Sequence, residues 1–85
     1  MFEVKLDNQP EKLLKKFERY IFNRFIKRLD GLKINPVPHD AKRIVGYEAP
    51  TFRIRVGKYR ILYRINYELK LIIVVKIDHR ERVYK

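Results

Sequence analysis

Four arginines alternate with apolar residues along residues 52–65. This alternation predicts two strands, and Gly57-Lys58 between them has the length of a two-residue turn with glycine first, as type II′ requires. In that register Arg55 lies directly opposite Arg60. One side of the hairpin is then apolar, and the other side carries the four arginines. These are Arg53, Arg55, Arg60 and Arg64.

Arginine at all four positions indicates an anionic ligand. The planar guanidinium binds phosphate through two parallel hydrogen bonds and stacks on bases. Like charges directly opposite each other destabilise a sheet, so Arg55 against Arg60 calls for a compensating anion. The alternative is a solvated face whose arginines pair with Glu48 or Glu68. Only four acidic residues occur in residues 42–85, which favours phosphate. Whether Lys76 joins the cluster depends on a one-residue choice of register in the next hairpin.

The segment from Asp78 to Lys85 adds candidate chemistry, because it holds a histidine, two arginines and a tyrosine. Such a set could supply a proton acceptor, charge stabilisation and a ring that stacks on a base. Taken alone, the same residues also fit a polar tail with one aromatic anchor. The other histidine, His39, follows a proline and is expected to be a loop residue.

Several kinds of site are excluded by composition. The chain has no cysteine and no serine, so thiolate and serine nucleophiles, disulfides and cysteine-ligated zinc are ruled out. Its two histidines are too far apart for metal-ligand spacing, and its three isolated glycines form no phosphate-binding loop. We therefore expect neither a metal nor a cofactor.

Charge is concentrated in the second half of the chain. The formal net charge is +11, of which residues 42–85, with twelve basic and four acidic side chains, carry +8. Such an excess favours a polyanionic partner. No apolar run is long enough to span a membrane, and charges interrupt the first residues where a signal peptide would need an apolar stretch. The default expectation is a cytoplasmic protein.

The elements that must position these residues follow from periodicity. Residues 1–85 are expected to form one domain of α+β class, with helices on one face of a mostly antiparallel sheet of three to four strands. A short strand over residues 2–6 precedes a helical pattern over residues 11–32. The apolar stripe is wider than one straight helix needs, but no glycine or proline marks a turn, so the pattern fits one long helix or a helical hairpin. Residues 37–49 are irregular. The remaining strands are expected at residues 51–56, 59–65 and 71–77, and a final run at residues 82–84 could pair at an edge.

Two motifs together resemble a known family. The hairpin core Arg-Val-Gly-Lys-Tyr-Arg-Ile-Leu-Tyr, followed by the closing His-Arg-Glu-Arg-Val-Tyr, is similar to the RelE/ParE superfamily of toxins from toxin–antitoxin systems. The resemblance covers essentially the whole chain. It implies a helical hairpin packed on a small antiparallel sheet, and so favours two helices over one.

The resemblance also implies an activity and residues for it. RelE-type toxins enter the ribosomal A site and cleave the messenger RNA there, without a metal. By position, the catalytic candidates are Arg53, Arg55, Arg60, Arg80 and Tyr84. Arg60 and Arg80 would hold phosphate, and Tyr84 would stack on or orient the substrate. The candidates for further RNA contacts are Arg43, Arg64, His79 and Arg82. Arginine is a poor proton acceptor, so Arg53 and Arg55 are not expected to act as simple general bases.

The expected partners are the ribosome, its messenger RNA and a cognate antitoxin that is RelB-like, acidic and helical. Two other functions remain open. A ParE-like toxin would inhibit DNA gyrase without cutting RNA, and a basic RNA-binding module would have no catalytic activity. The arginine set and the closing motif favour the ribonuclease.

Overall fold

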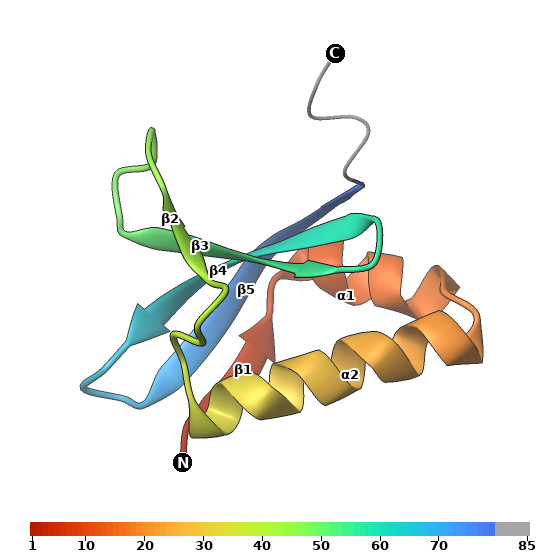
Figure 1. The fold of residues 1–85 in the computed structure, drawn as a ribbon, viewed down its shortest axis with the longest axis horizontal. Helices are drawn as coiled ribbons and strands as arrows, with labels where there is room; N and C mark the ends of the chain where they lie inside the picture. The colour runs from red at the N-terminus through yellow and green to blue at the C-terminus, as the bar shows by residue number, and fades with distance from the viewer. Residues whose placement is uncertain (80–85) are drawn as a thin grey trace.

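A five-stranded sheet forms the body of the protein (Figure 1). The computed structural model describes residues 1–79. The strands are β1 (Glu3–Leu6), β2 (Lys42–Ile44), β3 (Thr51–Val56), β4 (Tyr59–Asn66) and β5 (Leu71–His79). Their spatial order is β1-β5-β4-β3-β2, with β1 parallel to β5 and the other pairs antiparallel. The α+β class is confirmed, but the expected strand count was too low.

The strand missing from the sequence-based count is β2. It is only three residues long and lies inside the segment expected to be irregular. It pairs with the first three residues of β3, from Thr51 to Arg53. A strand this short has no run of alternation that a periodicity argument can detect, because its regular backbone depends on the neighbouring strand.

The β3–β4 hairpin has the predicted register. Val56 pairs with Tyr59, Arg55 with Arg60, and Phe52 with Tyr63. Gly57 has a φ of 58°, which is the left-handed conformation that the first turn position of a type II′ turn requires.

An irregularity between β4 and β5 settles the position of Lys76. Leu62 pairs with Lys76, whereas the next residue, Tyr63, pairs with Val74, so Val75 is an extra residue on β5. Such a bulge changes which side chains share a face on either side of it. As a result, Lys76 lies on the same side of the sheet as the arginines, and Val74 lies on the core side.

Two helices connect β1 to β2, as the resemblance implied. They are α1 (Asn8–Lys16) and α2 (Arg19–Ile34). Phe17 and Glu18 separate them with extended backbone, their ψ angles being 147° and 153°. The Phe17 ring lies 5.1 Å from the Phe25 ring and 5.0 Å from the Tyr59 ring, so core packing accompanies a break that no glycine or proline marks.

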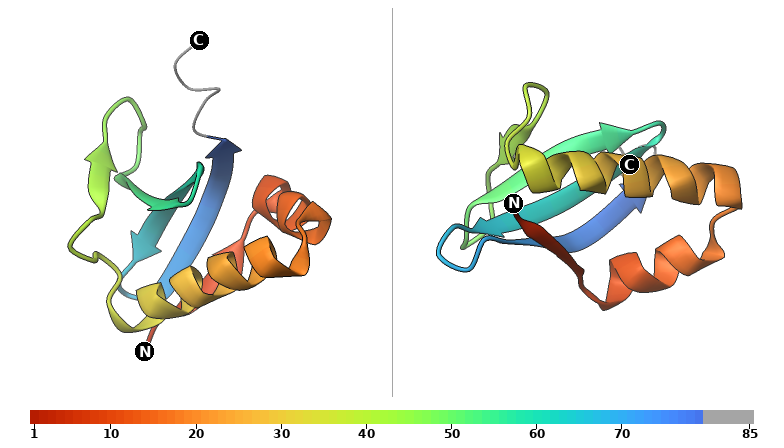
Figure 2. Two further views of the ribbon diagram at one scale, coloured as in Figure 1. Left: turned by 45° about the vertical axis from the view of Figure 1, so that its right-hand side comes forward. Right: turned by 90° about the horizontal axis from the view of Figure 1, so that it is seen from below.

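The core lies between α2 and one face of the sheet (Figure 2). Phe25, Leu29 and Leu32 of α2 recur at helical spacing and are buried against the apolar side of the strands. On the sheet, Ile54 and Ile61 are almost fully buried. One face of the sheet is thus covered by helix, and the opposite face is left to bear the charged residues of β3 and β4.

The first strand and the first helix fasten β5 along its outer edge. β1 pairs with β5 from Glu3 to Leu6, and the Asp7 N–H then donates to the Val74 carbonyl at 3.0 Å. Beyond that point the Gln9 side chain forms hydrogen bonds with the backbone of β5. Its Nε2 donates to the Ile77 carbonyl at 2.8 Å, and its Oε1 accepts from the Ile77 N–H at 2.9 Å. One amide side chain therefore satisfies the backbone groups that a longer β1 would have paired.

Within residues 1–79, no helix is long and apolar enough to cross a membrane.

Candidate functional site

The sheet surface opposite the helices carries the four predicted arginines, and we call this surface the arginine face. Arg53 and Arg55 come from β3, and Arg60 and Arg64 come from β4. Arg55 is exposed, and the other three are partly buried. Since Arg55 and Arg60 are direct cross-strand partners, the structure brings these two cations together as the sequence predicted.

Strand β5 adds two charged residues to this face that the sequence reasoning did not assign to it. Lys76 pairs with Leu62, and Asp78 pairs with Arg60. The Lys76 Nζ lies 3.6 Å from Asp78 Oδ1. Once Lys76 is placed on the arginine face, strand alternation places Asp78 there as well. The missing signal was the bulge at Val75, which no sequence pattern revealed.

The arginines of this face differ in how they are held. Arg64 Nε donates to Thr51 Oγ1 at 3.2 Å, and its guanidinium lies 6.0 Å from the centre of the Tyr47 ring. Arg60 is different: its Nε is buried without a hydrogen-bond partner among the described residues. A buried donor without an acceptor is costly, so a phosphate oxygen at this position would be stabilising. Arg60 is therefore poised to bind an anion, whereas Arg64 is tied into the loop before β3.

Two predicted RNA contacts lie on the other side of the sheet. Arg43 pairs with Phe52, which faces the core side, while its neighbour Lys42 pairs with Arg53 and shares the arginine face. His79 pairs with Tyr59, and the two rings meet edge to face at 5.0 Å. The structure therefore does not bring Arg43 or His79 together with the arginines, and it offers Lys42 in their place.

The remaining predicted site residues are Arg80, Arg82 and Tyr84. They lie outside the described residues, as does the expected edge strand at residues 82–84.

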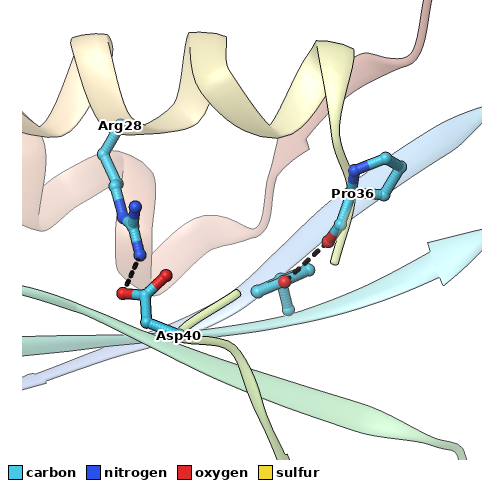
Figure 3. A network of polar contacts seen from close by, with 4 residues as sticks. Arg28, Pro36 and Asp40 are labelled. Atoms are coloured by element: carbon cyan, nitrogen blue, oxygen red, sulfur yellow. Dashed lines mark hydrogen bonds and ion pairs between the residues drawn. The ribbon is translucent and has the colours of Figure 1, made fainter. Parts of the chain in front are cut away.

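Polar contacts fix the segment after α2 against the rest of the domain (Figure 3). Arg28 on α2 forms an ion pair with Asp40, and its hydrogen bond holds the pKa of that carboxyl below the ordinary value of 3.8. The Tyr63 hydroxyl donates to the Pro36 carbonyl at 2.7 Å. Burial raises the pKa of Tyr63 to about 12, so this hydroxyl stays protonated at neutral pH and acts as a structural donor.

Within residues 1–79, no three His, Cys, Asp or Glu side chains are grouped as metal ligands. His39 is exposed, outside any helix or strand. Guanidinium groups are well suited to bind phosphate, so the arginine face is a candidate anion-binding surface.

Comparison with known proteins gives a consistent result. Residues 4–84 match the family described as "ParE toxin of type II toxin-antitoxin system, parDE". Toxin RelE1 of Methanocaldococcus jannaschii is 33% identical over 87 residues, which cover 99% of this chain and 96% of that protein.

Solved structures agree with the fold. The archaeal RelE–RelB complex from Pyrococcus horikoshii contains a chain that superposes with a TM-score of 0.82 at 30% identity, covering 95% of this chain and 97% of that one. The isolated RelE toxin of Escherichia coli superposes with a TM-score of 0.80 over 99% of this chain and 92% of that one. Its identity is 20%, so it supports the fold alone.

Proposed function

Because this chain belongs to the RelE/ParE superfamily of type II toxin–antitoxin toxins, we propose that it is a ribosome-dependent endoribonuclease that cleaves messenger RNA in the A site. The observation that carries the proposal is the pair Arg55 and Arg60 on the arginine face. The two cations face each other, and within residues 1–79 neither forms an ion pair with a carboxylate. A bound phosphate would relieve the repulsion between them.

The proposed reaction needs no metal. The 2′-oxygen of the RNA attacks the adjacent phosphorus while the bond from phosphorus to the 5′-oxygen breaks. The departing 5′-oxygen takes a proton from solvent, so the products are a 2′,3′-cyclic phosphate and a 5′-hydroxyl. Arg53, Arg55, Arg60 and Arg80 would hold the phosphate and stabilise the charge of the pentacoordinate transition state. Tyr84 would stack on a base and fix the in-line geometry.

The proton of the 2′-hydroxyl needs an acceptor, and Asp78 is our candidate. It is the carboxylate opposite Arg60 in the strand register, and its side chain is 26% exposed. A carboxylate can accept a proton, which an arginine cannot do at neutral pH. The ribosome would supply part of the substrate orientation, so a weak base could suffice.

The antitoxin is proposed from the same evidence. Several of the solved relatives are complexes of a RelE toxin with a RelB antitoxin. For this chain we propose an acidic, helical antitoxin that covers basic surface and neutralises the toxin.

The deciding experiment is in-vitro translation of a short message with purified protein, with cuts mapped by primer extension. We expect new ends within the A-site codon that are absent from naked RNA and absent with Arg80→Ala. Lys12→Ala, which removes an exposed charge on α1, should cut like the wild type. A message with a 2′-deoxy residue at the cut position should stay intact, and cleavage there would contradict attack by the 2′-hydroxyl.

A second candidate is inhibition of DNA gyrase, because the matching family is described as the ParE toxin. An intact message with unimpaired translation, together with loss of gyrase supercoiling in the presence of the protein, would establish it in place of the ribonuclease.

A further inference from the structure

A second basic surface lies between α2 and the β3–β4 turn, and we propose that it binds the phosphates of the RNA strand where that strand leaves the arginine face. This surface is a cleft of about 700 Å³, which we call the α2 cleft. The basic residues that line it are Arg24, Lys27, Arg28 and Arg55. The proposal rests on the proposed function, because it takes RNA as the ligand of the arginine face.

The charge of the α2 cleft is almost unopposed. Asp40 is the acidic residue among those that line it, and it is already engaged by Arg28. The Nε of Arg28 is buried without a hydrogen-bond partner among the described residues. Arg24 and Lys27 are both exposed on α2. Together with Arg55, they leave the α2 cleft with a clear positive excess, which favours an anionic ligand.

The position of Arg24 depends on the hairpin turn. A β-carbon built on Gly57 would lie 3.1 Å from Arg24 Nη1 and 3.6 Å from its Cζ. The guanidinium of Arg24 therefore rests close against the backbone of the turn, where a β-carbon would crowd it. This contact brings a cation of α2 to the end of the same hairpin that carries the arginine face.

Arg55 connects the two surfaces. It faces Arg60 on the arginine face, and it also lines the α2 cleft. The two surfaces lie on opposite sides of the sheet, but β2 pairs only with residues 51–53 of β3, so β3 is the outermost strand at Arg55. A single strand that crosses Arg60 and Arg55 can therefore pass around this edge into the α2 cleft without leaving positive potential. Proteins that bind single-stranded nucleic acid commonly use such a continuous basic groove to follow the backbone. This continuity favours RNA over an acidic peptide as the ligand.

The test measures binding of 2′-O-methyl RNA, which lacks the attacking hydroxyl, by fluorescence anisotropy over a range of salt concentrations. The cleft variant is Arg24→Gln/Lys27→Gln, and the matched control is Lys12→Gln/Lys16→Gln, which removes two exposed charges from α1. For single strands, each lost phosphate contact lowers the slope of log K against log salt by about 0.7. With an oligonucleotide of about twelve nucleotides, the cleft variant should bind about 25-fold more weakly at 0.1 M salt and show a slope lower by about 1.4.

The control variant should show neither change. A trinucleotide can occupy only one of the two surfaces at a time, so it should bind the cleft variant nearly as well as the wild type. Equal losses in the two variants would mean a general effect of net charge and would overturn the proposal. So would an unchanged slope in the cleft variant. Because the assay needs neither ribosomes nor cleavage, failure of the A-site ribonuclease would appear only in the translation experiment.

Discussion

Arg55 and Arg60 face each other on the arginine face at a cost to stability. Two like charges across a strand pair repel, and strand positions offer many residues that would avoid the conflict. The sequence nevertheless places arginine at both positions. Since sites that bind charged ligands are where such local conflicts are expected, the pair marks the candidate site more specifically than the net charge does.

Replacing one member should therefore separate stability from activity. We expect Arg55→Thr to raise the free energy of unfolding by about 0.2–1 kcal/mol, because it removes the repulsion and threonine suits a strand. The same change should lower A-site cleavage at least ten-fold. Chemical denaturation and the translation assay measure the two effects. The control is Lys5→Thr on β1, whose strand partner is the uncharged Ile73. A destabilised Arg55→Thr would contradict the argument from repulsion.

The ion pair of Arg28 with Asp40 should appear in the pH dependence of stability. The pKa of Asp40 is lowered in the folded state, so its ionised form stabilises the fold above the ordinary pKa of 3.8, and this contribution is lost as the pH falls through the lower folded value. Asp40→Asn should be slightly less stable than the wild type at pH 7, by at most about 1 kcal/mol for an exposed pair. The difference should vanish in strong acid. Urea denaturation at both pH values tests this, and a difference that stays constant with pH would exclude the ion pair as its cause.

At the scale of elements, the edge of β5 depends on a side chain. Gln9 lies in the first turn of α1, and its side chain makes the backbone hydrogen bonds to β5 that a longer β1 would have made. Its two hydrogen bonds to Ile77 fix the end of β5, which is also where Asp78 joins the arginine face. The position of a strand that carries part of the candidate site thus depends on a side chain of α1 at the outer edge of that strand.

Gln9→Ala should destabilise the protein by about 1–3 kcal/mol, since it leaves both backbone groups of Ile77 without that partner. The Ile77 amide should also exchange with solvent faster, which hydrogen exchange followed by NMR can detect at that residue. Asn8→Ala is a suitable control, because Asn8 is exposed in the same helical turn. Unchanged protection of the Ile77 amide would mean that water replaces the glutamine at no cost.

How much of these elements the sequence predicts depends on where the determining interactions lie. The hairpin register follows from local alternation and one glycine, and it was predicted residue by residue. The helix break at Phe17 involves contacts with Phe25 and Tyr59, and only the family resemblance favoured it. Three features depend on contacts between distant segments. They are β2, the bulge at Val75 and the two hydrogen bonds of Gln9 to Ile77. Periodicity carries no information about such contacts, so Asp78 and Lys42 were not assigned to the candidate site.

For the whole molecule, two kinds of surface remain for a partner. One is basic, in keeping with the net charge of +11. The other consists of single exposed apolar side chains near the two ends of α2, where Tyr20 is 72% exposed and Ile34 is 77% exposed. RNA would use the first surface, and a helical antitoxin would gain from both, because apolar contact is not screened by salt.

Salt should consequently separate the two complexes. If the protein contacts four phosphates of the RNA, a five-fold rise in salt concentration should weaken RNA binding about a hundred-fold. The antitoxin complex should weaken much less, so added antitoxin should displace labelled RNA more effectively as salt increases. Anisotropy titrations at several salt concentrations measure both affinities. Equal salt dependence of the two would mean that the antitoxin is held by charge alone.

The parallel pairing of β1 with β5 also sets an order of events during synthesis. The hydrogen bonds of Gln9 join it to Ile77, 68 positions later in the chain. β1 and α1 therefore leave the ribosome long before their partner strand has been made. Until then β4 lacks a neighbour on one side, and the arginine face lacks Lys76 and Asp78. Translation itself thus delays assembly of the arginine face, and a growing chain completes this surface only after β5 has been made and has paired between β1 and β4.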